Sequence, residues 1–258
     1  MYIYIYDEYV NHKKYEHLLG QIETRITDLG LNGKIVRLGI MKSIQDSVST
    51  EIRNGAKTII AVGNDKTINQ TVHSIINFQK SHNTKTEIFF GIIPVGEKNN
   101  LIAKALGIKE WKEACEILSG RRVETIDIGQ ANDNYFLAQA EICGQGTMLK
   151  INKHYSIEIT EPGKIHIINL SLYPNNLPHN TKSSPQDGIL ELYIQTKKHS
   201  LIKFNSQINQ SFFSFQKLTI FNKHTSLLVD NSINMPAPIN INVLKKRLNI
   251  IVGKKRKF

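Results

Sequence analysis

Cysteine is scarce in this sequence, which has only Cys115 and Cys143 among its 258 residues. Zinc sites and thiol redox motifs need cysteines a few residues apart, and small secreted scaffolds need several pairs. The two cysteines fit neither pattern, because they lie far apart in the chain. Their scarcity excludes a disulfide-stapled miniprotein and favours a reducing, cytoplasmic compartment.

Long apolar runs are also missing. No segment approaches the roughly 18 apolar residues that span a bilayer, and no basic-then-apolar leader opens the chain. We therefore expect a protein that is neither secreted nor embedded in a membrane. At about 150 residues per domain, the length predicts one large domain or two modest ones.

Acidic residues are outnumbered: 33 Lys and Arg stand against 22 Asp and Glu, so the formal net charge is +11. A basic surface attracts nucleic acid or the anionic headgroups of a membrane. Nucleic acid is not expected as a partner, because the sequence has no aromatic-interleaved basic helix and no zinc-finger or RNP motif. Basic clusters at residues 245–247 and 254–257 fit either a solvated tail or a surface for an anionic partner.

The first half of the chain alternates between strand-like and helix-like segments. Apolar or β-branched runs predict strands at 2–6, 34–38, 57–62 and 87–93, and helical spacing predicts helices over 18–29, 43–54 and 68–77. Repeated β–α alternation predicts a parallel sheet covered by helices. Ligands of such sheets bind beyond the carboxyl ends of the strands, so the loops after Val62 and Ile93 are the expected functional positions.

After about Asp127 the pattern changes to short strands with a period of two. Residues 155–160, 190–195 and 218–220 alternate between apolar and polar side chains, which indicates an antiparallel, half-buried sheet. Residues 175–186 are rich in Asn, Pro, Ser and Lys and predict a long loop. The expected fold is therefore α/β, with a parallel-sheet domain over residues 1–126 followed by a β-rich, sandwich-like domain over residues 127–258.

The first loop, residues 62–67, reads Val-Gly-Asn-Asp-Lys-Thr and leads from a buried strand into a helix. Its backbone N–H groups and the positive end of the helix suit a phosphate. A plain turn in which Asp65 or Thr67 caps the helix explains the same residues. Residues 93–100 repeat the arrangement, with Gly96 in a tight turn and Asn99 or Asn100 at a helix start. A Pro-Gly turn with an Asn cap is the alternative there.

The two loops resemble those of the diacylglycerol kinase catalytic-domain family, which includes sphingosine kinases and bacterial lipid kinases and shares its fold with NAD kinases. The family's first loop is Gly-Gly-Asp-Gly-Thr, an apolar residue and Asn, matched here by Gly63, Asp65, Thr67, Ile68 and Asn69. Its second loop is Pro-x-Gly-Thr-x-Asn-Asp, matched by Pro94, Gly96 and Asn99. Weaker matches follow in family order at 126–129, 187–192 and 228–230, so the resemblance runs from about residue 57 to the C-terminus.

The resemblance implies transfer of a phosphoryl group from ATP to a lipid hydroxyl, with Mg²⁺ as the metal. It implies a nucleotide site formed by Gly63, Asn64, Asp65, Lys66, Thr67, Asn69, Gly96 and Asn99. It also implies that Asp230 is the catalytic base and that Asp65 and Asp187 are metal ligands. An Asp-Asn-Ser hairpin turn is the alternative for Asp230, and a turn before a strand is the alternative for Asp187.

The sequence departs from the family at several active positions. Family residues are replaced by Asn64 and Lys66 in the first loop, by Glu97 and Asn100 in the second, and by Asn231 and Ser232 after Asp230. Lys66 stands where the family has glycine, and lysine incurs a conformational cost at positive φ. It also offers a point charge for phosphate. The family's N-terminal Asn-Pro-x-Ser-Gly is absent, with residues 6–9 in its place.

Two functions are expected from these matches and departures. The first is an ATP-dependent lipid kinase with an unusual nucleotide loop, acting in the cytoplasm as a peripheral protein on the anionic inner face of the membrane. The alternative is a noncatalytic pseudokinase that binds a nucleotide, a lipid or a protein partner. An NAD-kinase-like enzyme fits less well, because the second loop is closer to that of lipid kinases.

Overall fold

The computed structural model describes residues 1–258 except 40, 83–85, 97–99, 153–154, 174–182 and 198–207. It divides into two compact units, residues 1–126 with 247–257 and residues 127–246 with 258. The division falls between residues 126 and 127, where the sequence pattern changes. The C-terminal residues differ from the prediction, because 247–257 belong to the first unit instead of the second.

The first unit is built on a parallel sheet with the strand order β2-β1-β3-β4. Its strands are β1 (Tyr2–Tyr6), β2 (Gly33–Arg37), β3 (Thr58–Gly63) and β4 (Phe89–Pro94). The end of β16 (Ile239–Ile251) extends this sheet beyond β4, where Asn249 pairs with Phe89 in parallel. This returning strand places the C-terminal residues in the first unit.

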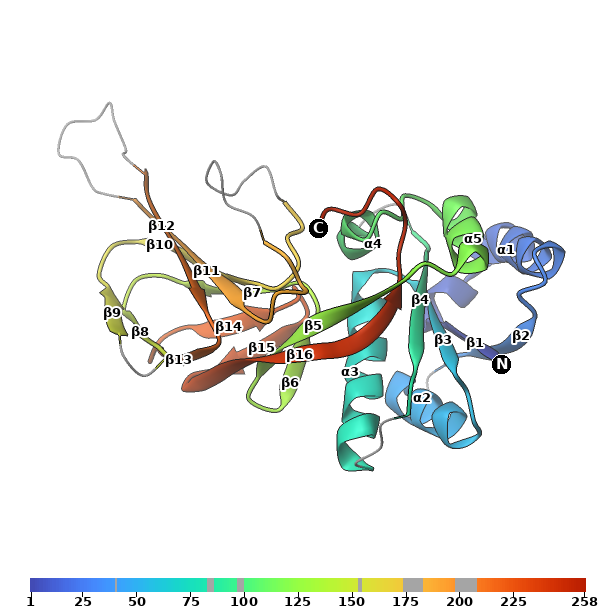
Figure 1. Ribbon diagram of the computed structural model, residues 1–258, viewed down its shortest axis with the longest axis horizontal. Helices are drawn as coiled ribbons and strands as arrows, with labels where there is room; N and C mark the ends of the chain where they lie inside the picture. The colour runs from blue at the N-terminus through green and yellow to red at the C-terminus, as the bar shows by residue number, and fades with distance from the viewer. Residues whose placement is uncertain (40, 83–85, 97–99, 153–154, 174–182, 198–207) are drawn as a thin grey trace. The chain divides into compact units, whose positions relative to one another are not determined.

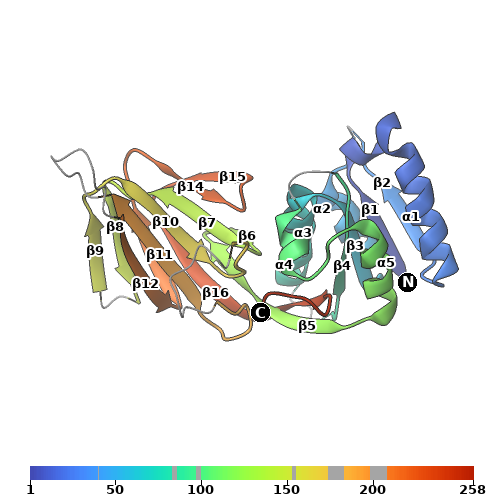
Figure 2. The ribbon, with the colours of Figure 1, turned by 90° about the horizontal axis from the view of Figure 1, so that it is seen from above.

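Helices cover both faces of the first unit's sheet (Figures 1 and 2). On one face α2 (Ile44–Arg53) packs against α3 (Asp65–Ser81), and on the other α1 (Glu16–Asp28) packs against α5 (Trp111–Gly120). The short α4 (Leu101–Ala105) contacts α3. The predicted parallel sheet with covering helices is confirmed. No helix in the described ranges has both the length and the apolar composition needed to cross a membrane.

The second unit consists of two sheets with a shared core. One contains β16, β13 (Lys217–Phe221), β8 (Thr147–Ile151), β9 (Tyr155–Ile159), β5 (Val123–Ala131) and β6 (Asn134–Phe136). The other has the order β12 (Ile208–Phe215), β11 (Leu190–Lys197), β10 (Gly163–Ile168), β7 (Gln139–Cys143), β14 (Ser226–Val229), β15 (Ile233–Pro236). Apolar side chains of both sheets, such as Leu149 and Ile167, form one buried cluster. The predicted β-rich, sandwich-like domain is confirmed.

The predicted strands over 155–160, 190–195 and 218–220 correspond to β9, β11 and β13, and all three pair antiparallel. One detail is wrong. The alternation in β11 predicts that Glu191 and Tyr193 face solvent, but both are buried. Ser183 donates a hydrogen bond to Glu191, and the rings of His166 and Phe212 contact Tyr193. Most of the predicted loop over 175–186 lies outside the described residues.

Candidate functional site

The sheet of the first unit has a topological switch point between β1 and β3. The strand order β2-β1-β3-β4 means that the chain leaves β1 toward one edge of the sheet and leaves β3 toward the other. Ligands of open α/β sheets bind beyond the carboxyl ends of the strands at such a point. Asp7 follows β1 there, and Asn64 follows β3.

Thr67 connects the segments that follow β1 and β3. Its Oγ1 donates a hydrogen bond to Oδ2 of Asp7 at 2.6 Å, and the residue is fully buried. Gly63 makes this contact possible, because a Cβ at that position would lie 2.3 Å from Thr67 Oγ1. Asp7 was not among the predicted site residues, although its place directly after a predicted strand pointed to the same edge of the sheet.

Asn64 caps the N-terminus of α3. Its side-chain oxygen accepts hydrogen bonds from the N–H groups of Lys66 at 3.0 Å and Thr67 at 3.3 Å. The Thr67 hydroxyl accepts the N–H of Asn64 in return, which completes a capping box. The cap is therefore Asn64, not Asp65 or Thr67 as the turn interpretation proposed. Two amides that suit a phosphate already have an acceptor within the protein.

The glycine replacements in the first loop leave the backbone in common conformations. Asn64 has a φ of −102°, and Lys66 lies in the first turn of α3 and is not among the residues with positive φ. The predicted conformational cost at Lys66 is therefore wrong. The Lys66 side chain is exposed, whereas Asn69, one turn further along α3, is buried.

Asp65 connects the first loop to α4. Its carboxylate oxygens accept hydrogen bonds from the N–H groups of Leu101 at 2.9 Å and Ile102 at 3.0 Å. Burial raises the pKa of Asp65 to about 6, although the two amide bonds and the nearby Lys104 act in the opposite direction. Asp65 is thus a partly desolvated carboxylate at a helix N-terminus that titrates close to physiological pH.

The loop after β4 is fixed by hydrogen bonds to its backbone. The Tyr9 hydroxyl donates to the Val95 carbonyl at 2.8 Å, and Nδ2 of Asn100 donates to the Gly96 carbonyl at 2.7 Å. Gly96 has a φ of +102°, which disfavours any residue with a Cβ. Burial, followed by the Asp7 carboxylate, raises the pKa of Tyr9 above its usual range, so its hydroxyl stays protonated as a donor. The predicted nucleotide residue Asn99 lies outside the described residues.

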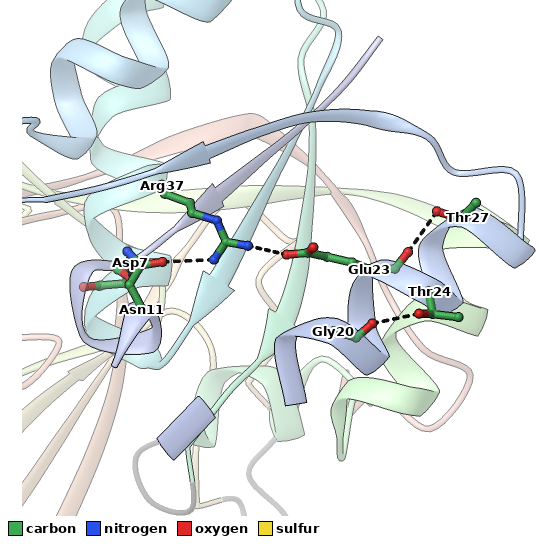
Figure 3. Close-up of polar contacts among 7 residues, drawn as sticks. All are labelled: Asp7, Asn11, Gly20, Glu23, Thr24, Thr27 and Arg37. Atoms are coloured by element: carbon green, nitrogen blue, oxygen red, sulfur yellow. Dashed lines mark hydrogen bonds and ion pairs between the residues drawn. The ribbon is translucent and has the colours of Figure 1, made fainter. Parts of the chain in front are cut away.

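A polar cluster fixes the segment after β1 (Figure 3). Nδ2 of Asn11 donates to the carbonyls of Asp7 at 3.3 Å and Leu38 at 2.9 Å. Arg37 donates to Oδ1 of Asn11 at 3.2 Å and forms an ion pair with Glu23 of α1 at 2.6 Å. The position of Asp7 is therefore tied to both β2 and α1.

Asp230 lies in the second unit, in the turn between β14 and β15. Asp230 and Asn231 both have positive φ, 43° and 54°, and the flanking strands pair antiparallel, so the Asp-Asn-Ser hairpin turn is present. Asp230 is 6% exposed. Its carboxylate accepts the N–H groups of residues 137, 138 and 139 at 2.8, 3.1 and 2.8 Å. These bonds fasten the hairpin to the start of β7, while the role of Asp230 as a base stays a prediction.

Asp187, the second predicted metal ligand, is exposed. Its Oδ1 accepts the N–H of Ile189 at 3.1 Å, so the turn before β11 is present as the alternative predicted. Within the described part of the chain, no three His, Cys, Asp or Glu side chains lie close enough together to hold a metal ion. A metal ion at Asp187 would therefore need other ligands than His, Cys, Asp or Glu side chains of the described residues.

A family model described as the diacylglycerol kinase catalytic domain matches residues 2–131. The match begins before residue 57, where the motif resemblance started, and so includes β1 and Asp7. No curated protein matches the chain. A crystal structure described as a diacylglycerol kinase from Bacillus anthracis str. Sterne has a TM-score of 0.77 at 14% identity, covering 98% of this chain and 97% of that chain. A second structure from this organism has a TM-score of 0.75 at 15% identity with the same coverage. At this identity the likeness establishes the fold.

Proposed function

Because the chain belongs to the diacylglycerol kinase catalytic domain family, we propose that it transfers a phosphoryl group from ATP to a lipid hydroxyl. One observation carries the proposal. The hydrogen bond between Thr67 and Asp7 joins the segments after β1 and β3 at the switch point of the sheet, where α/β proteins bind their ligands. The family's first loop therefore lies at the edge of the sheet where α/β proteins bind their ligands.

The nucleotide contacts follow from the two loops. Gly96, at a φ of +102°, would let the backbone of the second loop approach a phosphate closely, whereas the space beside Gly63 is filled by the Thr67 side chain. The exposed Lys66 would neutralise phosphate charge. Asn69 would contact phosphate or ribose, and Asn99 would face the nucleotide from the second loop. Thr67 is fully buried and would hold the first loop in place through its bond to Asp7.

Magnesium fits the donor set at this edge of the sheet. Mg²⁺ is usually held by one or two carboxylates together with substrate phosphates and water, and Asp7 and Asp65 supply two carboxylates there. A Mg²⁺ ion bound there would supply positive charge to the phosphate oxygens. Asp65 is proposed as a ligand, and the amides of Leu101 and Ile102 hold its carboxylate in place.

Asp230 is proposed as the base that accepts the proton of the lipid hydroxyl. A base must keep a fixed position within hydrogen-bond reach of that proton. The three backbone amides that bind the Asp230 carboxylate supply this fixed position without any mobile side chain. The lipid substrate requires a peripheral protein, so we also propose a cytoplasmic protein that adsorbs to an anionic membrane surface.

A noncatalytic function is the second candidate, and a specific observation favours it. The amides of Lys66 and Thr67, which suit a phosphate, are bound by the Asn64 side chain. A nucleotide phosphate would have to displace this cap or bind beside it. The same fold would then bind a nucleotide, a lipid or a protein partner without transferring phosphate.

Two measurements separate the candidates. A ligand that binds only the folded state raises the melting temperature, so MgATP should stabilise a nucleotide-binding protein. Mixed lipid vesicles incubated with γ-labelled ATP then report transfer. Label in the lipid fraction supports the kinase, stabilisation without label supports the noncatalytic binder, and absence of both contradicts the proposed function.

A further inference from the structure

The basic C-terminal segment, residues 252–257, is folded onto the first unit beside α4 (Figure 1). Backbone N–H groups of residues 252, 253 and 257 donate to the carbonyls of Arg122, Leu106 and Ala105, each at 2.9 Å. The packing is close, because a Cβ on Gly107 would lie 2.6 Å from the backbone nitrogen of Arg256. The segment is therefore not the solvated tail that the sequence allowed.

The folded segment presents basic side chains to solvent. Lys254, Lys255 and Lys257 are exposed, as are Lys104, Lys109 and Arg122 on the chain beside them. We call these six residues the basic face. Arg256 is different, because it is an anchor that pairs with Glu124 at 2.6 Å.

Most acidic side chains near the basic face already have partners. Glu124 pairs with Arg256, Glu116 pairs with Arg25, and Glu113 accepts the N–H of Lys109 at 3.0 Å. Glu113 and Glu116 line the same hollow of about 340 Å³ as Arg122, Lys254 and Lys255. Glu110, which is exposed, is the one other acidic residue between Lys104 and Glu124.

The basic face keeps its charge. Across the described residues, no carboxylate forms an ion pair with any of its six members. Apart from the electrostatic interaction of Lys104 with Asp65, its exposed positive charge is therefore available to an anionic partner.

We propose that the basic face is the surface by which this protein docks on an anionic lipid bilayer. The assignment rests on the proposed lipid kinase function, because that function requires the protein to reach a substrate in a membrane. Charge complementarity selects the bilayer: six exposed basic side chains suit anionic headgroups. The sequence has no zinc-finger or RNP motif that would favour nucleic acid instead.

The position of the basic face links docking to the candidate site. Lys257 is bound at the carboxyl end of α4 through Ala105, and Asp65 is bound at the other end through Leu101 and Ile102. A five-residue helix is about 8 Å long. Docking through the basic face therefore holds the loop of Asp65 close to the membrane.

The test compares two variants that remove the same charge from the same unit. One carries Lys254→Gln, Lys255→Gln and Lys257→Gln, and the control carries Lys13→Gln, Lys57→Gln and Lys80→Gln at other exposed positions. Sedimentation with phosphatidylcholine vesicles, with and without phosphatidylglycerol, measures binding. Because each basic residue near an anionic surface changes partitioning by about fivefold, the loss of three should make the first variant bind anionic vesicles about 100-fold more weakly than the control.

Three results would overturn the proposal. The first is that both variants lose the same amount of binding to anionic vesicles. The second is that the wild type binds neutral and anionic vesicles equally well. The third is that the first variant loses only its binding to a single-stranded oligonucleotide. Phosphate transfer to a water-soluble, short-chain diacylglycerol separates this inference from the proposed function. Absence of that transfer contradicts the kinase, whereas the vesicle comparison alone decides the basic face.

Discussion

At the scale of single residues, buried or half-buried carboxylates hold loops in place by accepting backbone N–H groups. Asp65 binds the start of α4, Asp230 binds the start of β7, and Asp127 accepts the N–H groups of Gly188 at 2.6 Å and Lys246 at 2.7 Å. An unpaired buried amide is costly, so each carboxylate stabilises its loop. The sequence shows only a polar residue at a strand end, which suits a loop anchor and a catalytic acid equally well.

Replacing Asp230 by Asn tests both of its roles. Asn keeps one acceptor oxygen but brings an NH₂ group toward three backbone donors, so the free energy of unfolding should fall by about 1–3 kcal/mol. If Asp230 is also the base, turnover measured below the melting temperature should fall by about two to four orders of magnitude. ATP binding should remain nearly unchanged. Urea unfolding and the lipid transfer assay measure the two effects.

Asp187→Asn is the matched control, because this acid is exposed in a turn. It should change the unfolding free energy by less than about 0.5 kcal/mol. An active wild type whose turnover survives Asp230→Asn would refute the base assignment, even if the variant is less stable.

The buried Glu191 should make the free energy of unfolding depend on pH. It is 2% exposed, and burial raises its pKa from 4.5 to about 7, although a hydrogen bond from Ser183 acts in the opposite sense. The folded state binds this proton more tightly than the unfolded chain. Its stabilising contribution is therefore complete below pH 4.5 and is lost as the pH rises through about 7.

Glu191→Gln removes this titration and keeps an acceptor for Ser183. The free energy of unfolding of the variant relative to the wild type should rise by about 1–3 kcal/mol between about pH 4 and pH 8. Urea unfolding at a series of pH values measures this difference. A difference that stays constant over the range would show that Glu191 does not titrate as inferred.

At the scale of elements, the candidate site is formed by the N-termini of two helices, α3 and α4. The N-terminus of α3 is closed by Asn64, and that of α4 by Asp65. Backbone amides at a helix N-terminus favour a negatively charged ligand. The protein's own side chains therefore occupy the positions where a nucleotide phosphate would be expected.

Asn64→Gly should increase the affinity for ATP. Glycine at an N-cap lowers helix stability by only a few tenths of a kcal/mol relative to Asn, and it frees the amides of Lys66 and Thr67. Freeing them should tighten MgATP binding about 3- to 10-fold, which corresponds to the net contribution of a typical hydrogen bond. Asn64→Ser keeps a capping oxygen and should leave the affinity unchanged. Identical affinities for Gly and Ser variants in titration calorimetry would mean that phosphate does not bind these amides.

Periodicity and turn residues predicted most of the elements, because these are local properties of the sequence. The helix over 43–54, for example, begins after the cap Ser43 and ends before Gly55 at a φ of +85°. The return of β16 to the first unit could not be predicted. Its pairing of Asn249 with Phe89 joins residues far apart in the chain, and nothing local marks that partner.

At the scale of the whole molecule, the first unit is completed by the C-terminus of the chain. Leu248, Ile250, Ile251 and Val252 are all buried, and the first three belong to β16, which pairs with β4. Each fully buried aliphatic side chain contributes about 1.5–3 kcal/mol. The sequence of the first half alone is therefore an incomplete domain.

A fragment of residues 1–126 should consequently fail to fold stably, because β4 loses its neighbour and a part of the core is missing. Joining residues 247–258 to this fragment through a flexible Gly/Ser linker should restore a cooperative thermal transition. Circular dichroism melting curves compare the two. A cooperative transition in the shorter fragment, at the same temperature, would contradict the role assigned to β16.

Hydrogen exchange in the presence of MgATP tests the central claim most directly, namely that a nucleotide binds at the loops that follow β3 and β4, beyond the carboxyl ends of these strands. Binding there should slow amide exchange in residues 63–69 and 100–106 and leave β12 of the second unit unchanged. A wild type that is stabilised by MgATP but shows unchanged exchange in both of these stretches would contradict the account.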